Sequence, residues 1–370
     1  MSIVGRSLVS LDDFSLGDID HLLRVAQEMV RRPQDFRNTC SGRILATLFY
    51  EPSTRTKLSF ESAMLRMGGS TLGFSDARSS SAAKGESIAD TIRVMSSYAD
   101  VLVMRHPMEG AAKLAAEYAS VPVVNAGDGG HQHPTQTLTD LLTIVETKGG
   151  VRGHRVAFCG DLKYGRTVHS LIHTLARYQT RDFVLISPEE LSLPKALKDE
   201  LQQQQVTLHE YRRLEDAIAH VDILYMTRIQ RERFPQEADY QRLKDSYVLD
   251  VDKLGLAKPD LMVMHPLPRV NEIAYQVDAD PRSTYFRQAA YGVFARMALI
   301  TLQLGLIENA PGGVEQAATE PAGFRNDLLC PNPRCVTNGE RSAQPSFRAH
   351  GSHPQTYVCD YCEERIQAKA

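Results

Sequence analysis

At 370 residues the chain is long enough for two or three domains, each with its own core. A hydrophobic content of 42% and a charged content of 24% are typical of a globular protein, and no apolar run reaches membrane-spanning length. The formal net charge of −3 excludes a global basic field for nucleic acid or an acidic membrane. The N-terminal residues do not resemble a signal peptide, so we expect a cytoplasmic protein with no membrane partner.

The first predicted elements are a helix, a strand and a second helix. Leu16–Val30 carries apolar residues at helical spacing, and Ile44–Tyr50 is an apolar run typical of a buried strand. Pro52 interrupts this strand pattern, and Ser53 is a good N-cap for a helix that continues through Leu65. A strand that leads directly into a helix N-terminus presents unpaired backbone N–H groups, which bind anions.

The start of this second helix is rich in hydrogen-bond donors. Hydroxyl groups and a planar guanidinium come from Ser53, Thr54, Arg55 and Thr56. The stretch therefore predicts a phosphate cradle. Local chemistry alone leaves an ordinary capped helix with a solvated arginine as the alternative.

A polar, glycine-bearing loop follows the next predicted strand, Ser70–Phe74. The segment Arg78–Ser87 consists mostly of small and polar residues, which is typical of a surface loop. It is either a flexible connector with a solvated lysine or a mobile lid that carries Ser80 and Lys84 to an anion.

Helices and strands then alternate, with helices expected at 92–98 and 110–119 and strands at 101–104 and 121–124. Arg105 lies just past a strand, where ligands sit in open α/β sheets, although a surface salt bridge is the alternative. A glycine-rich break follows, and Pro134 suits the first turn of a new helix. His133 and Gln136 lie three apart at the start of this helix, so we expect them on one face, at a site.

Lys148–Gly150 predicts a hinge into a second α/β unit. Its strands are expected at 155–159, 183–186, 206–210 and 223–226, and its helices at 168–178, 195–204 and 214–220. The turn between Gly160 and Gly165 lacks the Lys-Ser/Thr pair of a nucleotide-binding P-loop. Arg228 again follows a strand, and two prolines stiffen the loop His265–Arg269. A long apolar-faced helix at 291–304 is predicted to return to the first domain.

Repeated alternation of strands and helices predicts an α/β fold with two doubly wound parallel-sheet domains and a small C-terminal β domain. We expect the first domain at 1–149, completed by a helix at 286–308, and the second domain at 150–285. A Pro-, Gly- and Ala-rich linker is expected at 309–326 and a small domain at 327–370. The cleft between the two large domains is the expected site.

The C-terminal domain is predicted to hold zinc. Of six cysteines, four gather here as two pairs, Cys330 with Cys335 and Cys359 with Cys362, which is the pattern of a tetrahedral four-thiolate site. His350 and His353 are alternative ligands. Many zinc ribbons bind nucleic acid, but five Lys or Arg are balanced here by five Asp or Glu, so we expect no nucleic-acid partner.

These motifs resemble a known family. Ser53–Thr56, followed by a Ser-Phe-Glu helix, resembles the carbamoyl-phosphate loop of the carbamoyltransferases. Four later stretches resemble the aspartate branch of that family in order and spacing. They lie around His106, His133, Arg166 and His265. The resemblance covers residues 1–308, and residues 327–370 resemble the zinc domain of that enzyme's regulatory chain.

The resemblance implies a role for each candidate residue. The phosphate would be held by Ser53, Thr54, Arg55 and Thr56, with Ser80 and Lys84 arriving from a neighbouring subunit. The carbamoyl oxygen would accept hydrogen bonds from Thr56, Arg105 and His133, and the carbamoyl NH2 would bind Gln136 and the carbonyls of Leu267 and Pro268. The carboxylates of aspartate would be clamped by Arg166, Arg228 and Gln230. The expected catalytic residues are Arg55, Thr56, Lys84, Arg105 and His133.

The implied activity is transfer of the carbamoyl group of carbamoyl phosphate to the amine of L-aspartate, as in de novo pyrimidine biosynthesis. The loop His265–Arg269 matches the aspartate branch, because ornithine enzymes carry a cysteine-bearing loop there. The resemblance also implies structural zinc, no organic cofactor and a homotrimer with shared active sites, and it leaves the pairing of trimers open. A catalytically silent assembly subunit of a carbamoyltransferase complex is the alternative function.

Overall fold

The computed structural model describes residues 3–229, 236–243, 247–307, 324–350 and 353–367. These residues form two compact units. Unit 1 comprises Met1–Thr135 and Val293–Ala370, and unit 2 comprises Gln136–Gly292. Among the described residues, no helix is both long and apolar enough to cross a membrane.

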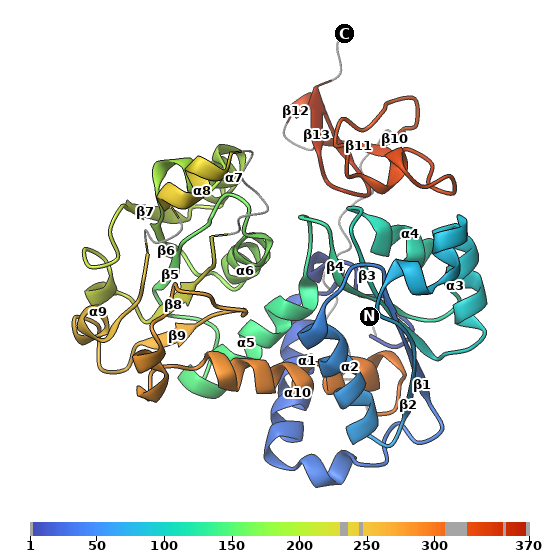
Figure 1. Cartoon of the computed structure of the whole chain (residues 1–370), viewed down its shortest axis with the longest axis horizontal. Helices are drawn as coiled ribbons and strands as arrows, with labels where there is room; N and C mark the ends of the chain where they lie inside the picture. Colours follow the sequence, from blue (N-terminus) through green and yellow to red (C-terminus); the bar gives the residue numbers. More distant parts are fainter. Residues whose placement is uncertain (1–2, 230–235, 244–246, 308–323, 351–352, 368–370) are drawn as a thin grey trace. The chain divides into compact units, whose positions relative to one another are not determined.

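Unit 1 is built on a parallel sheet with the strand order β2-β1-β3-β4 (Figure 1). Its strands are β1 (Ile44–Phe49), β2 (Ser70–Phe74), β3 (Val101–His106) and β4 (Val123–Asp128). Its helices are α1 (Leu16–Arg31), α2 (Thr54–Arg66), α3 (Ile88–Ser96) and α4 (Ala111–Tyr118). Every residue of β4 is buried, as expected for a parallel sheet that is covered on both faces.

Unit 2 is a parallel sheet with the strand order β7-β6-β5-β8-β9. Its strands are β5 (Val156–Cys159), β6 (Asp182–Ile186), β7 (Thr207–Tyr211), β8 (Ile223–Met226) and β9 (Met262–Met264). Its helices are α6 (Arg166–Arg177), α7 (Lys195–Gln203), α8 (Glu237–Leu243) and α9 (Val251–Gly255). Two further helices, α5 (Pro134–Lys148) and α10 (Tyr285–Gln303), contribute residues to both units.

Two predicted helices differ from the structure. The segment Leu214–His220 forms a turn and then a short 3-10 helix, Ile218–His220, because its apolar side chains are buried in the core of unit 2 and this packing overrides local helix propensity. The helix α10 begins at Tyr285, before the apolar-faced stretch predicted from residue 291 and one residue before the helix expected at 286–308. Further 3-10 turns lie at Leu11–Asp13, Pro33–Phe36, Ala77–Ser79, Ser81–Lys84, Glu189–Leu191, Tyr275–Ala279 and Val336–Asn338.

The C-terminal segment forms an antiparallel sheet in the order β10-β11-β12-β13, coloured orange to red in Figure 1. The strands are β10 (Phe324–Arg325), β11 (Phe347–His350), β12 (His353–Cys359) and β13 (Arg365–Gln367). We call residues 324–367 the zinc module. The predicted fold class, two parallel α/β sheets and a small β domain, is confirmed. Of the expected linker, residues 309–323 lie outside the described residues.

Candidate functional site

In unit 1, the predicted site segments all leave the carboxyl edge of one sheet. The cradle follows β1, the lid follows β2, Arg105 is the penultimate residue of β3, and the loop to His133 follows β4. All of these strands are parallel, so their carboxyl ends lie side by side, and this is the edge at which open α/β sheets bind ligands. The structure therefore brings these predicted segments of unit 1 together.

The cradle is a helix start that is open to a ligand. Ser53 occupies the N-cap position of α2 with an extended φ of −154°, but its side chain makes no capping hydrogen bond. The first turn of α2 contains no acidic residue, so nothing in that turn opposes the positive end of the helix dipole. Thr54 and Arg55 are exposed, and Thr56 is half-buried. These features suit an anion such as a phosphate.

Arg105 is held in place next to the cradle. Its guanidinium lies 2.9 Å from a carboxylate oxygen of Glu51 and donates to the carbonyl oxygen of Ala126 across 3.2 Å. Only 12% of its side chain is exposed. Glu51 precedes the cradle and Ala126 lies in β4, so these contacts fix Arg105 between two of the strand ends.

The lid is ordered by local contacts. The Ser80 hydroxyl donates to the carbonyl oxygen of Ala77 across 2.8 Å and accepts the N–H of Ala82 across 3.3 Å. Lys84 is exposed and ends the second 3-10 turn of the lid, before Gly85 adopts a left-handed φ of 87°. In this conformation the Ser80 hydroxyl is therefore hydrogen-bonded within its own loop, whereas the Lys84 ammonium is accessible.

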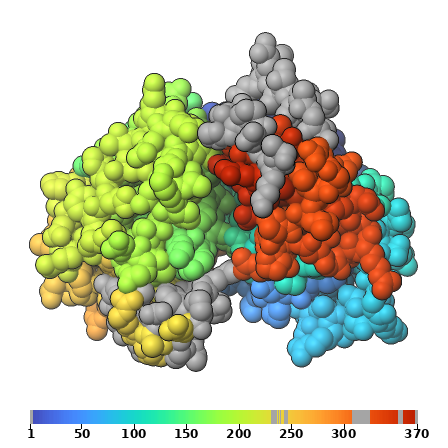
Figure 2. All heavy atoms as spheres, turned by 90° about the horizontal axis from the view of Figure 1, so that it is seen from above, coloured from blue at the N-terminus to red at the C-terminus, as the bar shows by residue number. Residues whose placement is uncertain are grey.

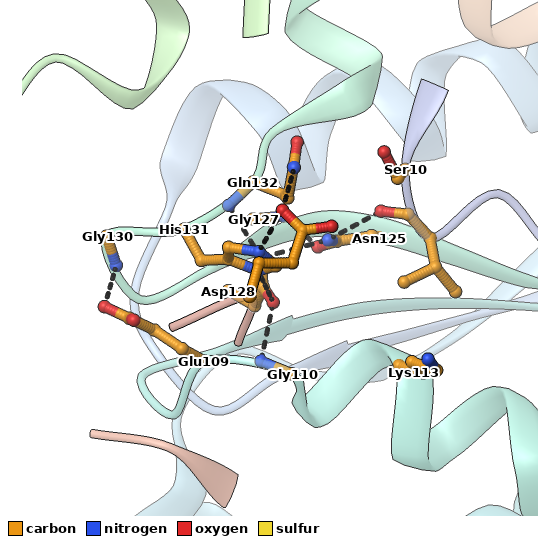
Figure 3. A network of polar contacts seen from close by, with 12 residues as sticks. Ser10, Glu109, Gly110, Lys113, Asn125, Gly127, Asp128, Gly130, His131 and Gln132 are labelled. Carbon is orange, nitrogen blue, oxygen red and sulfur yellow. Dashed lines mark hydrogen bonds and ion pairs between the residues drawn. The ribbon is translucent and has the colours of Figure 1, made fainter. Parts of the chain in front are cut away.

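The loop after β4 is organised by one buried carboxylate (Figure 3). Asp128 accepts hydrogen bonds from the side-chain amide of Asn125 at 3.0 Å, from the N–H of Gln132 at 3.0 Å and from the N–H of Gly110 at 2.8 Å. The loop closes on itself through these bonds and delivers His133, which is 6% exposed, to the start of α5.

His131 is bound at both ring nitrogens. Nδ1 lies 3.0 Å from Asp128, and Nε2 lies 3.1 Å from Glu363 of the zinc module. Burial disfavours the charged ring, but the two carboxylates outweigh burial and raise the pKa of His131 to about 10. At neutral pH both ring N–H groups therefore donate to carboxylates.

In unit 2, the candidate segments also share one edge of a sheet. Arg166 begins α6 just after β5, Arg228 follows β8, and the loop with Leu267 and Pro268 follows β9. β8 lies between β5 and β9 in the parallel sheet, so the three segments emerge next to one another. Gln230 lies outside the described residues.

The loop after β9 is fixed by His265. Its Nδ1 accepts the N–H of Leu267 across 2.7 Å, and its Nε2 lies 2.8 Å from a carboxylate oxygen of Glu272. Both side chains are buried, with 1% and 5% exposed. Leu267 has a left-handed φ of 56°, and the bond to Pro268 is cis. His265 thus shapes the turn that presents the two carbonyl groups.

The Gln136 side chain is held by a hydrogen bond to the buried Asp140. The Gln136 amide donates to Asp140 across 2.8 Å, and Asp140 also accepts from Tyr225 at 3.0 Å and from Gln288 at 2.6 Å. The carbonyl oxygen of the Gln288 side chain accepts the N–H of His265 across 3.0 Å. One buried network therefore supports both Gln136 and the loop after β9.

The zinc module has the ligand set for a metal. The thiols of Cys330, Cys335, Cys359 and Cys362 lie within 4.8 Å of one another, and all four residues are buried. Two of the sulfur–sulfur distances are 3.4 and 3.8 Å, close to the roughly 3.8 Å that a tetrahedral site with Zn–S bonds of about 2.3 Å requires. The four predicted ligands thus fit a closed structural zinc site, without His350 or His353.

Comparison with known proteins identifies the family. Residues 6–146 match the family model "Aspartate/ornithine carbamoyltransferase, carbamoyl-P binding domain", and residues 152–303 match its "Asp/Orn binding domain". The chain therefore belongs to the aspartate/ornithine carbamoyltransferase family. Residues 323–370 match the metal binding domain of the aspartate carbamoyltransferase regulatory chain.

Named relatives belong to the aspartate branch. The chain is 61% identical over 310 residues to the aspartate carbamoyltransferase catalytic subunit of Alkaliphilus metalliredigens, covering 84% of this chain and 100% of the relative. It is 59% identical over 302 residues to the catalytic subunit of Clostridium kluyveri, covering 82% of this chain and 99% of the relative. The resemblance to an aspartate carbamoyltransferase carrying a regulatory-chain zinc domain is confirmed.

Solved structures agree with this placement. The catalytic subunit of M. jannaschii aspartate transcarbamoylase superposes with a TM-score of 0.75 at 46% identity, covering 80% of this chain and 97% of that chain. Aspartate transcarbamoylase from Trypanosoma cruzi, in complex with N-(phosphonacetyl)-L-aspartic acid, superposes with a TM-score of 0.73 at 42% identity, covering 82% and 96%.

Sequence reasoning missed the supporting groups. Asp140, Gln288 and Tyr225 converge from different helices and a strand, and nothing local distinguishes them from other buried polar residues. Glu363 was also missed. Its backbone adopts a left-handed conformation directly after the zinc ligand Cys362, where glycine would be favoured, so a glutamate at this position is a usable signal.

Proposed function

We propose that the protein transfers the carbamoyl group of carbamoyl phosphate to the amine of L-aspartate, giving N-carbamoyl-L-aspartate and phosphate in de novo pyrimidine biosynthesis. The observation that carries this proposal is the convergence of the cradle, Arg105 and His133 on one sheet edge. The named catalytic-subunit relatives support aspartate as the acceptor.

The unit 1 residues bind and polarise carbamoyl phosphate. Backbone N–H groups and hydroxyls at the start of α2 hold the phosphate together with the guanidinium of Arg55. Thr56, Arg105 and His133 donate to the carbamoyl oxygen, where negative charge grows as the tetrahedral intermediate forms. Because Arg105 is already fixed by Glu51 and Ala126, little reorganisation is needed during the reaction.

The remaining contacts orient the two reactants. Gln136 and the carbonyls of Leu267 and Pro268 hold the carbamoyl NH2 group. Arg166 and Arg228, with Gln230, clamp the two carboxylates of aspartate. Binding both substrates in this way converts a bimolecular reaction into a unimolecular one, for which effective molarities reach on the order of 10⁵ M or more.

The chemical step needs no base from the protein. The amine nitrogen of aspartate forms a bond to the carbamoyl carbon, the bond from that carbon to the phosphate oxygen breaks, and the amine proton passes to the departing phosphate. Phosphate is a sufficient acceptor because its pKa lies near neutrality. The cradle then releases inorganic phosphate.

The proposed assembly is a cytoplasmic homotrimer in which Ser80 and Lys84 complete the site of a neighbouring chain. The carbamoyl-phosphate domain comprises residues 1–149 with the helix at 286–308, and the aspartate domain comprises residues 150–285. A linker at 309–326 leads to the zinc domain at 327–370, which serves assembly. The Lys84 ammonium is accessible, as contact with a neighbouring chain requires.

The deciding experiment measures carbamoyl aspartate formation by the purified zinc-loaded protein, with aspartate and ornithine compared as acceptors. We expect product with aspartate and none above background with ornithine. If zinc-loaded oligomers bind carbamoyl phosphate but form no product, the catalytically silent alternative is correct. Product with ornithine alone would overturn the assigned acceptor.

A further inference from the structure

The zinc module docks on the unit of the same chain that carries the cradle. At the centre of the contact, Glu109 is 6% exposed and pairs through its backbone with the module: its N–H donates to the Arg334 carbonyl at 2.8 Å, and its carbonyl accepts the Val336 N–H at 2.9 Å. Its carboxylate accepts from the Asn332 side chain at 2.6 Å and lies 3.1 Å from the Arg334 guanidinium.

Close packing and further hydrogen bonds surround Glu109. A Cβ on Gly110 would lie 2.5 Å from the Cβ of Tyr361 and 2.8 Å from its carbonyl group, so the backbones of the two residues are closely packed. The Tyr361 hydroxyl donates to Glu117 across 3.0 Å, and the Lys113 ammonium donates to the Asp360 carbonyl across 2.7 Å. Figure 2 shows the orange-red surface of the module pressed against the cyan and teal surface of unit 1.

The docking contacts reach segments that carry candidate site residues. Glu340 accepts the N–H of Ile88, at the start of the helix that follows the lid. Glu109 lies just past Arg105. Glu363 binds His131, two residues before His133. The module is therefore in contact with the lid end, the β3 end and the β4 loop.

Glu363 makes the most specific of these contacts. One oxygen of its carboxylate lies 3.1 Å from His131 Nε2 and also accepts from the Gln132 side chain across 3.3 Å. On its other side, His131 is bound to Asp128, the carboxylate that closes the loop (Figure 3). A single side chain of the module thus holds two consecutive residues of this loop.

The backbone of Glu363 has a conformation that is uncommon for a residue with a side chain. Its φ is 60°, a left-handed conformation that disfavours residues with a Cβ and that glycine adopts freely. Non-glycine residues persist in such conformations where surrounding contacts determine them, and they gather at functional sites. Here the turn is closed by two backbone hydrogen bonds, from the Glu363 N–H to the Cys359 carbonyl at 3.0 Å and from the Cys359 N–H to the Glu364 carbonyl at 2.9 Å, and the Glu363 side chain contacts His131 and Gln132.

We propose that Glu363 is a positioning residue that acts through His131 to hold the loop at 125–133, so that the zinc module preorganises the active site of its own chain. The catalytic part of this inference rests on the proposed function. The loop-holding part concerns the contacts alone and is tested without turnover.

The test compares Glu363→Gly and Glu363→Gln with the control Glu364→Ala, which changes the adjacent exposed glutamate. Glycine removes the carboxylate and relieves the left-handed strain, so a purely structural role predicts an unchanged or more stable module with unchanged activity. Our proposal instead predicts that Glu363→Gly keeps its zinc and oligomer size but loses about tenfold or more in kcat. Glu363→Gln retains an acceptor for both partners and should stay close to wild type.

Hydrogen–deuterium exchange of the amides at 129–132 provides the readout that is independent of catalysis. We expect roughly tenfold faster exchange in Glu363→Gly, because the loop loses its outer anchor. His131→Leu lies outside the zinc module and should accelerate amide exchange to the same extent. This variant therefore tests the contact even if Glu363→Gly loses zinc. Unchanged exchange in His131→Leu would overturn the proposal, as would wild-type kcat in zinc-loaded Glu363→Gly.

Failure of the proposed function has a different signature. It would appear as absence of carbamoyl aspartate formation by the wild-type protein, whereas the exchange comparison still shows whether Glu363 holds the loop. Wild-type activity with equal exchange in all variants would leave the function intact and remove only the positioning role.

Discussion

Gln288 connects two active-site elements through one buried side chain: it donates to Asp140 across 2.6 Å and accepts the N–H of His265 across 3.0 Å. Gln288 is 1% exposed and Asp140 is fully buried. Asp140 anchors Gln136, and His265 shapes the loop after β9. The groups proposed to contact the carbamoyl NH2 therefore share one support.

Replacing Gln288 with methionine should destabilise unit 2 by about 2–3 kcal/mol, because the change leaves a buried N–H without its acceptor and removes a donor from a buried carboxylate. Urea unfolding measures this difference. The matched control is Arg287→Met on the same turn of α10, an exposed site where a change within about 0.5 kcal/mol is expected. Equal effects of the two substitutions would contradict the network.

Arg55→Ala and His133→Ala should each lower kcat by roughly 10²–10³, equivalent to about 3–4 kcal/mol of transition-state stabilisation. Arg55 is exposed and its proposed role is to contact the phosphate, so its loss should leave the fold intact. Steady-state kinetics give the effect, and circular dichroism confirms folding. Arg24→Ala, an exposed arginine on α1, serves as the control with wild-type rates. A loss below tenfold for both site variants would refute the assignment.

Arg228→Ala should raise the KM for aspartate far more than the KM for carbamoyl phosphate. Arg228 follows β8 in unit 2, whereas the cradle belongs to unit 1, so the residues proposed for the two substrates lie on different sheets. Initial rates with each substrate varied in turn separate the effects. Lys163→Ala, an exposed cation in the turn after β5, should leave both constants unchanged. Equal shifts for the two substrates in Arg228→Ala would show that the substrates are wrongly divided between the units.

Mixing Lys84→Ala with Arg55→Ala subunits should recover part of the activity that each variant lacks alone. If the lid completes a neighbouring site, hybrid oligomers contain some sites with both an intact cradle and an intact lysine. Activity is measured after subunit exchange has been verified with differently tagged chains. Absence of recovery in verified hybrids would place the lid in the site of its own chain.

The sequence predicts this site where a motif follows a strand directly. Ser53, Arg105 and Arg228 are each preceded by an apolar run, and parallel strands bring such positions to one edge. The supporting contacts could not be predicted, because they join distant positions: Gln288 and Asp140 are 148 residues apart, and Glu363 and His131 are 232 apart. Pairing over such separations depends on packing that no local pattern encodes. The prediction of a helix at Leu214–His220 was wrong for a related reason. Local propensity does not decide the conformation of a segment that connects two strands.

The stability of unit 1 should fall in mild acid because of His106. This side chain is 6% exposed, and its Nδ1 accepts the N–H of Met108 across 3.0 Å. The centroid of its ring lies 4.7 Å from the centroid of the Tyr50 ring. Burial disfavours the charged ring and lowers the pKa of His106 to about 4. The folded chain therefore binds fewer protons at this residue than the unfolded chain does between about pH 6.5 and pH 4.

Over that window the free energy of unfolding falls as the pH falls, and above about pH 7 His106 contributes no pH dependence. The full loss from this residue is on the order of 3 kcal/mol, most of it below pH 6. Urea unfolding of wild type and His106→Asn at pH 5 and pH 7.5 isolates the contribution, because loss of zinc in acid affects both proteins alike. The asparagine variant should be less stable at pH 7.5 but should lose less stability on acidification. If both proteins lose the same amount, folding does not lower the pKa of His106.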